Sequence, residues 1–523
     1  MGWQVTADML WCLGYGASAL LLVAWAVQLL HWAWWTPRRL DRALRAQGIK
    51  GTPYSFLRGD VAENVRLLRA ARSKPMPLSH DIAPRVFPLQ HRAVEEYGKL
   101  SFTWLGPQPR LTIFDIDQVR EVLSNKFGHY GKTRVNSLWR FFIGGLVTYE
   151  GDKWAKHRRI LNPAFHVEKL KSMLPAFSAC CDDLVCRWEK MVGSDTCYEL
   201  DVWPEFQSFT GDVISRSAFG SNYEQGRRIF QLQDEQALLL IQSARNLYIP
   251  GYRFLPTRTN NRIKAIDREV RTIIRGIIKK REEAMKMGKP CNNDLLGLLM
   301  ESNIKQVQEN GNKNAGMTIE EVVEECKLFY FAGQETTSVL LTWTMVLLSM
   351  YPSWQDRARE EVLRLFGKNR PDFDGLNHLK TVTMILYEVL RLYPPAIFLL
   401  RQTYKTMKLG NVVYPPGVAL VMPIILIHHD PDLWGADVNE FKPERFAEGI
   451  SKASKNDQVA FFPFGSGPRI CIGQSFALVE AKIALCVILQ RFSFELSPSY
   501  AHAPYTVITL QPQHGAPIRL RRL

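Results

Sequence analysis

The hydrophobic positions fall into one apolar stretch at the N-terminus and a long body in which apolar residues recur at helical spacing. Residues 9–27 are apolar apart from Ser18, and apolar character then resumes as far as Trp35. A helix of that length is sufficient to cross a bilayer. Trp32, Trp34 and Trp35 gather where the stretch ends, as tryptophans do at a membrane interface. The pattern therefore predicts one transmembrane helix within residues 1–36.

The charges that flank this stretch predict its orientation. Four arginines follow it directly, namely Arg38, Arg39, Arg42 and Arg45, and no Lys or Arg precedes it. The positive-inside rule places such a basic flank in the cytosol and the short N-terminus in the lumen. A cleaved signal peptide is the alternative, but it would begin with basic residues and have a shorter apolar segment. We expect a basic linker over residues 37–53, ending in the short hinge Gly-Ile-Lys-Gly-Thr-Pro, and then a body over residues 54–523.

The body has the pattern of a mainly helical protein with small β-sheets. Between Asn261 and Lys286, isoleucines and a valine recur at helical spacing opposite a basic face. Residues 302–316 are polar and rich in Gly and Asn, which predicts a loop. Thr318 with Glu321 then forms a capping box that opens a long helix ending near Ser349. Short strands are predicted at residues 100–105, 110–114, 419–422 and 507–510, and no internal repeat divides the body.

Composition and charge limit the possible binding partners and the cellular location of the protein. The chain has 523 residues, is 46% hydrophobic and carries a formal net charge of +15. Such a charge suits an anionic membrane surface or an acidic protein partner, whereas nucleic acid is not favoured because the basic residues are spread along the whole chain. The nine cysteines include no C-x-x-C pair and suggest no disulfide framework. A reducing, cytosolic location fits the body best.

The strongest chemical signal is the string from Phe464 to Gly473, F-G-S-G-P-R-I-C-I-G. A lone cysteine is usually a small buried hydrophobe. Here glycines allow the backbone to approach a ligand closely, and amide groups with a helix N-terminus downstream stabilise a thiolate. Arg469 is placed to neutralise a carboxylate of the ligand. The string resembles the heme signature of the cytochrome P-450 superfamily, F-x-x-G-x-R-x-C-x-G, at every fixed position. The resemblance implies the cytochrome P-450 fold, a heme b cofactor and Cys471 as the ligand of its iron.

Two further matches occur in the order that this family shows. Residues 332–337, Ala-Gly-Gln-Glu-Thr-Thr, lie in the middle of the long predicted helix, where Gly and consecutive Thr are unfavourable. The resemblance implies an oxygen-binding segment in which Glu335 and Thr336 deliver protons; the alternative is a packing kink with exposed polar residues. Glu388 and Arg391 share one helix face. With Arg445 of the Pro-Glu-Arg-Phe string they correspond to the family's structural triad beneath the heme.

The remaining cofactor residues also come from the resemblance. Trp154 and Arg158 match a W-x-x-x-R element that reaches a heme propionate, and Arg401 occupies the place of another propionate arginine. His157 is either a second contact of this kind or a packing or surface residue. The implied substrate pocket is mostly apolar, which suits a lipophilic guest. Its members are the 135–142 loop, the 396–399 segment with Ala396 and Ile397, and Leu328, Phe331, Ala332 and Tyr500.

The resemblance covers the full chain and narrows to plant family 72 at residues 47–51, 125–129 and 498–515. It implies a monooxygenase in the endoplasmic reticulum membrane that receives electrons from NADPH through a flavoprotein reductase and uses O2. Iridoid, triterpenoid or gibberellin-like substrates, or a xenobiotic such as a herbicide, are what the family suggests. The chain departs from many membrane-bound members at the hinge, where it has GIKGTP in place of a Pro-rich sequence.

Two other classes of function stay open from the sequence. One is a heme-binding sensor or carrier without turnover, which would have no need of the Glu335–Thr336 pair. The other is a heme-thiolate isomerase or dehydratase, which needs no external electrons. Consumption of NADPH on addition of substrate distinguishes a monooxygenase from both.

Overall fold

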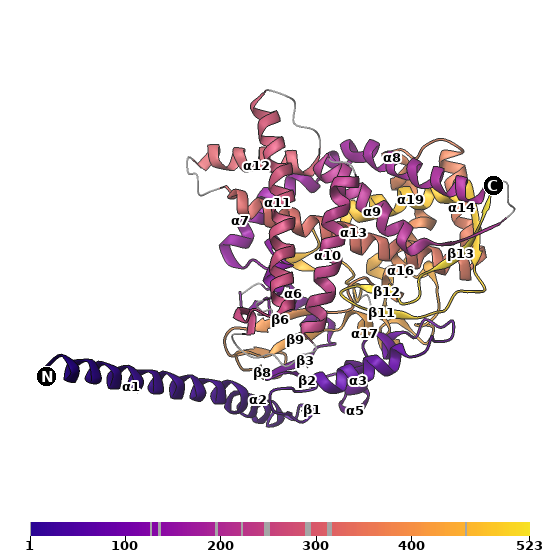
Figure 1. Cartoon of the computed structure of the whole chain (residues 1–523). Helices are drawn as coiled ribbons and strands as arrows, with labels where there is room; N and C mark the ends of the chain where they lie inside the picture. The colour runs from indigo at the N-terminus through magenta and orange to yellow at the C-terminus, as the bar shows by residue number, and fades with distance from the viewer. Residues whose placement is uncertain are drawn as a thin grey trace.

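A computed structural model of the chain describes residues 2–125, 128–133, 138–193, 197–220, 223–244, 252–287, 294–310, 316–455 and 458–523. Helices make up most of the body, and the largest sheet lies at the end of the body from which the N-terminal helix projects (Figure 1). The predicted class, mainly α with small β-sheets, is therefore confirmed.

The helices follow one another along the whole chain. In the first half they are α1 (Gly2–Leu30), α2 (Thr36–Arg45), α3 (Val61–Arg72), α4 (Ala83–Val86), α5 (Pro88–Tyr97), α6 (Ile116–Ser124), α7 (Gly151–Leu161), α8 (Val167–Val192), α9 (Val202–Phe219) and α10 (Tyr223–Ala244). In the second half they are α11 (Arg258–Lys286), α12 (Leu295–Asn310), α13 (Ile319–Met350), α14 (Pro352–Phe366), α15 (Phe373–His378), α16 (Lys380–Leu392), α17 (Ile424–His428), α18 (Pro431–Trp434) and α19 (Gln474–Arg491).

In the described part of the chain, the strands form one mixed sheet and three smaller antiparallel ones. They are β1 (Lys50–Gly51), β2 (Ser101–Leu105), β3 (Gln108–Thr112), β4 (Tyr130–Gly131), β5 (Tyr198–Asp201), β6 (Leu399–Thr403), β7 (Met407–Leu409), β8 (Val412–Tyr414), β9 (Ala419–Met422), β10 (Phe492–Leu496), β11 (Pro504–Thr506), β12 (Leu510–Pro512) and β13 (Pro517–Arg522). The large sheet has the order β1-β2-β3-β9-β6-β4, and β10-β13-β5, β11-β12 and β7-β8 form the others.

Helix α13 is the central element of the body. It packs against α9, α10, α11, α16 and α19, and most of its side chains from Val322 to Ser349 are buried. The capping box predicted at its start is present, because Thr318 Oγ1 accepts from the Glu321 amide and Glu321 accepts from the Thr318 amide. The helix ends at Met350, and Pro352 is the first residue of α14, where a missing N–H costs nothing.

Two expectations of secondary structure were wrong. Within the loop expected at residues 302–316, residues 302–310 belong to α12, while residues 311–315 lie outside the described part of the chain. The polar residues there are mostly the solvent-facing side of a helix, and Asn303 also caps the next segment by accepting from the Met317 amide at 2.5 Å. The strand expected at residues 507–510 is instead mainly the turn between β11 and β12, in which the Val507 amide donates to the Thr509 carbonyl.

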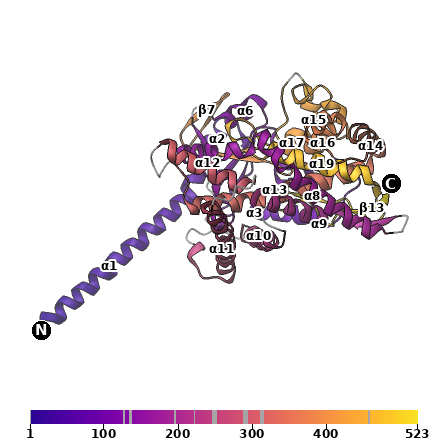
Figure 2. The same ribbon diagram turned by 90° about the horizontal axis from the view of Figure 1, so that it is seen from above.

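The N-terminal apolar stretch forms α1, which projects away from the body in two perpendicular views (Figures 1 and 2). It is long and apolar enough to be a candidate membrane span, and it continues through a π-helical turn, His31–Trp35, into α2. Leu40 and Leu44 of α2 are buried against the body. Residues 50–51 of the expected hinge pair in parallel with β2. Residues 50–51 are thus part of the large sheet. The boundaries predicted between the anchor, the linker and the body stay predictions.

Candidate functional site

The cysteine of the signature lies in a tight loop ahead of α19. The loop closes on itself, because the Cys471 amide donates to the Phe464 carbonyl at 2.9 Å. Gly467 has a φ of +70°, and a Cβ there would lie 2.6 Å from the Leu123 carbonyl oxygen at the end of α6. Only glycine fits both the left-handed backbone and this close approach. The spacing in the signature is therefore explained by how the loop is folded against α6.

Opposing influences act on the pKa of the Cys471 thiol. The residue is accessible, yet desolvation by the surrounding protein raises the pKa of its thiol, while the Gly473 amide and Arg158 act to lower it. Arg158 also donates to the Ile470 carbonyl at 3.0 Å, which fixes α7 to the cysteine loop.

Cationic side chains gather beside this loop. Desolvation, followed by repulsion from Arg401 and Arg469, lowers the pKa of Lys132 to about 7. Desolvation and Arg469 likewise lower the pKa of Arg401 to about 10. Glu150 offsets part of this charge by accepting from Arg469 at 2.8 Å. An excess of buried positive charge is unfavourable without an anionic partner, so this cluster fits a group that carries carboxylates, as the propionates of heme do.

The structure thus brings together most of the predicted cofactor residues. The Arg469 guanidinium lies 4.6 Å from the centre of the Trp154 ring, and Arg401 is buried in β6. Lys132 and Glu150 belong to the same cluster but were missed from the sequence. Neither residue has a diagnostic spacing, because each reaches the cluster from a loop that only the tertiary fold brings near.

On α13, Glu335 and Thr336 have different partners. Thr336 Oγ1 donates to the Ala332 carbonyl at 2.7 Å. Glu335 is buried and accepts from Thr509 Oγ1 and Gln511 Nε2 at the β11–β12 turn, while burial raises the pKa of its carboxyl. The sequence reasoning missed Thr509 and Gln511, which carry no local signal.

Residues 332–337 are α-helical throughout, and Gln334, Glu335 and Thr337 are buried rather than exposed. The glycine before Glu335 has a packing role. A Cβ on Gly333 would lie 2.7 Å from the Ile214 side chain of α9, so glycine allows the two helices to approach closely.

The three residues of the predicted triad meet in the interior. Glu388 and Arg391 are fully buried and joined by two bonds of 2.7 Å, from Arg391 Nε and Nη2 to the two carboxylate oxygens. Arg445 Nε lies 3.5 Å from Glu388 Oε1. Arg391 also donates to main-chain carbonyls at residues 428, 438 and 440. The triad joins α16 to the segment that precedes the cysteine loop, a structural arrangement.

His157 does not lie at the surface. It is fully buried, and its Nδ1 lies 2.6 Å from Glu325 Oε1 of α13. Of the two readings left open, this contact favours a packing residue that joins α7 to α13.

The residues expected to line a substrate pocket are divided among several environments. Leu328 and Ile397 are buried in the main hydrophobic core, whereas Phe331, Ala332 and Ala396 are partly accessible. The Tyr500 hydroxyl lies 2.8 Å from His502 Nδ1 in a cluster of tyrosines and histidines. Residues 135–137 of the expected loop lie outside the described residues, and the lining stays a prediction.

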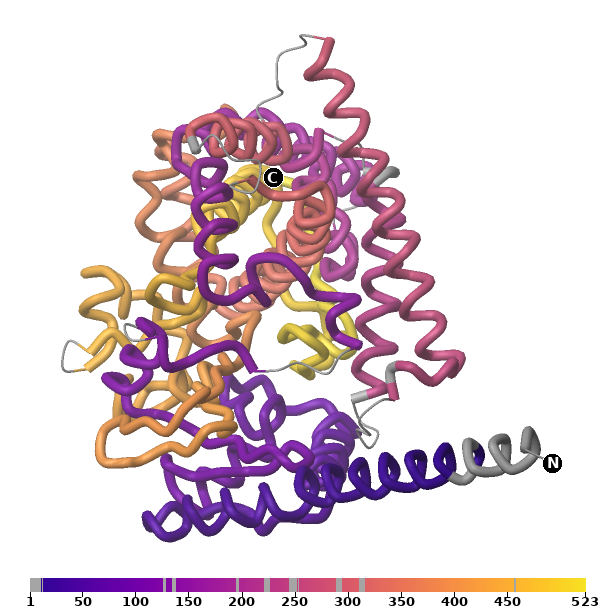
Figure 3. The backbone as a smooth tube through the Cα atoms, turned by 90° about the vertical axis from the view of Figure 1, so that its left-hand side faces the viewer, coloured from indigo at the N-terminus to yellow at the C-terminus, as the bar shows by residue number. Residues whose placement is uncertain are grey.

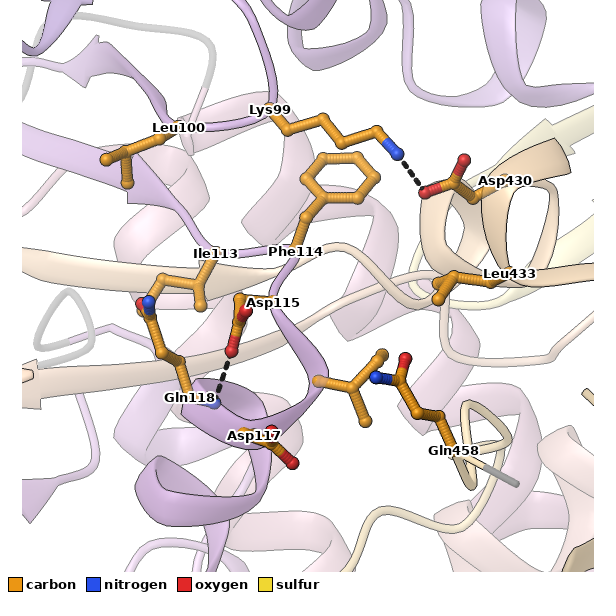
Figure 4. Close-up of a pocket in the computed structure, with 11 residues that line it drawn as sticks. Lys99, Leu100, Ile113, Phe114, Asp115, Asp117, Gln118, Asp430, Leu433 and Gln458 are labelled. Carbon is orange, nitrogen blue, oxygen red and sulfur yellow. Dashed lines mark hydrogen bonds and ion pairs between the residues drawn. The ribbon is translucent and has the colours of Figure 1, made fainter. Parts of the chain in front are cut away.

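A separate hollow lies between the ends of α5 and β3, the start of α6, and α18 (Figure 4). Lys99 reaches Asp430 across it at 2.5 Å. None of the residues that line the hollow belongs to the predicted site, so we assign it no part in the chemistry.

Comparisons with known proteins agree with this geometry. The family model described as Cytochrome P450 matches residues 85–513. The chain is 63% identical to Cytochrome P450 CYP72A616 of Paris polyphylla over 97% of this chain and 99% of the relative. It is 54% identical to Cytochrome P450 CYP72A219 of Panax ginseng over 96% of this chain and 97% of the relative. Among solved structures, a retinoic acid-bound cyanobacterial CYP120A1 superposes with a TM-score of 0.75 at 23% identity, covering 91% of this chain and 99% of that one.

Proposed function

Because the chain belongs to the cytochrome P450 family and is a heme-dependent monooxygenase, we propose that it oxidises a terpenoid-like lipophilic molecule at the membrane of the endoplasmic reticulum. In this proposal electrons come from NADPH through a flavoprotein reductase. The family implies O2, a redox partner and a small-molecule substrate. The substrate class, the reductase and the location are the parts that we add.

The cofactor residues have separate tasks in this proposal. Cys471 supplies the thiolate that ligates the iron. The negative charge of the propionates would be balanced by Lys132, Arg401 and Arg469. Glu150 by itself offsets part of the charge of these three cations. When bound, the heme activates dioxygen for insertion of one oxygen atom into a C–H bond.

Glu335 and Thr336 of α13 would hold and transfer protons for the reaction. The Thr336 hydroxyl can both donate and accept, and its present acceptor is the Ala332 carbonyl. Glu335 is held by Thr509 and Gln511, and its raised pKa favours the protonated form from which a proton can be given. A heme carrier without turnover does not require a buried acid next to a hydroxyl group.

The observation that carries the proposal is the cationic cluster beside the accessible Cys471 thiol, together with α13 packed along α19. A terpenoid is supported by the relatives, because proteins 53–63% identical to this chain are named as family 72 proteins. A xenobiotic is the alternative within the same chemistry.

The membrane part of the proposal rests on the N-terminus. Helix α1 is a candidate span, and Arg38 of α2 lies over the Trp34 ring at 3.6 Å, where the apolar segment meets the basic one. We place the catalytic domain in the cytosol because this basic flank follows the span.

The experiment is product analysis by mass spectrometry. Microsomes that contain the protein and a plant reductase are incubated with iridoids, triterpenoids, gibberellins and herbicides, with and without NADPH. We expect a hydroxylated product from a terpenoid only when NADPH is present. Conversion without NADPH would favour an isomerase or dehydratase, and binding without conversion or NADPH consumption would favour a sensor or carrier.

A further inference from the structure

A short segment next to α13 forms part of a second hydrophobic cluster. This segment, residues 138–147, contains the turns Trp139–Phe141 and Gly145–Val147. Its Leu138 and Phe142 are buried with residues of α10 and α11, separately from the main core, and Phe331 and Ile508 pack against them. The Phe142 and Phe331 rings meet edge to face at 4.7 Å. The segment therefore packs on Phe331 of α13, which precedes Ala332 and belongs with it to the predicted substrate pocket.

A buried lysine of α13, Lys327, is hydrogen-bonded to the backbone of this segment at Phe141. The Lys327 side chain is 2% exposed, and its Nζ donates to the Phe141 carbonyl at 2.7 Å. The same ammonium group contacts Asp267 Oδ1 of α11 at 2.5 Å. Lys327 lies one turn before Phe331, so the backbone and the ring of the segment are fixed from neighbouring positions on one helix.

A buried glutamate of α13, Glu325, is hydrogen-bonded to the same segment at Leu146. Glu325 is fully buried and accepts from the Leu146 amide at 3.0 Å, as well as from His157. The 138–147 segment is thus bound at Phe141 and at Leu146 to charged side chains only two residues apart on α13. Its position depends on polar contacts with α13 as well as on hydrophobic packing.

The charges around Lys327 are balanced by a compact cluster between α11 and α13. Arg271 contacts Asp267 at 2.9 Å and also contacts Glu324, while Lys327 lies 3.7 Å from Glu324. Helices α10 and α11 run side by side along this flank of the body (Figure 3). Burying an ammonium group is costly unless it is paired. Here the pairing leaves one N–H of Lys327 directed at a carbonyl of the segment.

We propose that Lys327 is a positioning residue that sets the size of ligand the substrate pocket admits. Its bond to the Phe141 carbonyl fixes the 138–147 segment against Phe331, and loss of that bond lets the segment shift and the pocket change shape. This inference rests on the proposed function, since it takes the space beside Ala332 to be the pocket.

The test compares two variants of the full-length holoenzyme. The double variant, Lys327→Met with Asp267→Asn, lacks the N–H donor to the Phe141 carbonyl. It keeps Arg271 and Glu324 as a pair of opposite charges. Asp267→Asn alone disturbs the same ion cluster but keeps the donor. Retention of the red-shifted Soret band of the ferrous–CO complex shows that each variant is folded around its heme.

The probes are imidazole, which is small, and clotrimazole, which fills a large pocket; both bind the iron through nitrogen and shift the Soret band. In the double variant we expect the Kd of clotrimazole to change about tenfold, the size expected when a hydrogen bond from a charged group is lost. The Kd of imidazole in the double variant should stay within about twofold of the wild-type value. In Asp267→Asn alone, the Kd values of both ligands should stay within about twofold of wild type.

Three results would overturn the inference: an unchanged clotrimazole Kd in the double variant, equal changes for both ligands, or the same change in Asp267→Asn alone. If the double variant does not fold, Lys327→Arg tests the same contact with the charge retained, because the planar guanidinium places its N–H groups differently from an ammonium at the Phe141 carbonyl. Lys327→Arg must then alter the ratio of the two constants, and an unaltered ratio refutes the proposal. A wild-type protein in which neither ligand shifts a Soret band would instead contradict the heme function itself.

Discussion

Replacement of Arg391 by Lys tests how the triad supports the site. The Arg391 guanidinium makes five hydrogen bonds: two to Glu388, at 2.7 Å each, and three to carbonyls at residues 428, 438 and 440, at 2.9, 2.8 and 3.2 Å. An ammonium group has three N–H donors, so at least two of the five bonds are lost. A buried group left without its partner costs about 1–3 kcal/mol. The expected loss is therefore roughly 2–6 kcal/mol, a large part of the ~5–15 kcal/mol that stabilises a typical fold.

The assay is urea denaturation of the detergent-solubilised holoenzyme, followed by heme absorbance. Arg357→Lys is the matched control, because Arg357 pairs with Glu444 at 3.0 Å on the surface, with both side chains about half exposed. An exposed pair contributes at most ~1 kcal/mol, so the control should denature close to wild type. If Arg391→Lys denatures at the same urea concentration as Arg357→Lys and retains its heme, the buried contacts do not support the site as we argue.

The other predictions concern the ligand, proton delivery, topology and docking. Cys471→Ser should abolish the red-shifted Soret band of the ferrous–CO complex, because a hydroxyl does not replace the electron donation of a thiolate; a mutant that keeps the band would refute the ligand assignment. Thr336→Ala should lower the ratio of product formed to NADPH consumed and raise hydrogen peroxide release. Thr342→Ala, which removes an equivalent bond to the carbonyl four residues earlier, should leave that ratio unchanged, and equal ratios in the two variants would make Thr336 a packing residue. Protease added to intact microsomes should digest the body, since we place it in the cytosol, and its full protection would contradict this topology. Reductase-dependent turnover should fall as salt rises while peroxide-driven turnover does not, because salt screens steering by the net charge of +15; a flat response of both would remove the support for electrostatic docking.

The features that the sequence predicted correctly depend on neighbours in the chain. The cysteine loop is closed by a hydrogen bond between residues 464 and 471, and the positive φ of Gly467 is a local backbone conformation, although the approach of Gly467 to α6 is not local. The capping box likewise involves only Thr318 and Glu321, which are three positions apart. Such signals are complete within a short window, so they can be read without knowing the fold.

The features that the sequence did not predict depend on contacts between distant segments. Lys132 meets Arg401 and Arg469 only after the sheet and the cysteine loop have come together. The partners of Glu335 lie more than 170 positions further along the chain, as the separations of 174 and 176 to Thr509 and Gln511 show. Residues 302–310 were mistaken for a loop because their polar composition outweighed the helical continuation of α12. Composition does not say whether a polar segment is a loop or the exposed face of a helix.

The central claim is that the protein inserts one oxygen atom from O2 into a lipophilic substrate. The most direct measurement is turnover under isotopically labelled dioxygen, with the microsomal protein, reductase, NADPH and whichever terpenoid of the panel is converted. We predict a product that carries one labelled oxygen atom for each molecule formed, and no product when NADPH is withheld. A product without the label, or one that forms equally well without NADPH, would contradict the account.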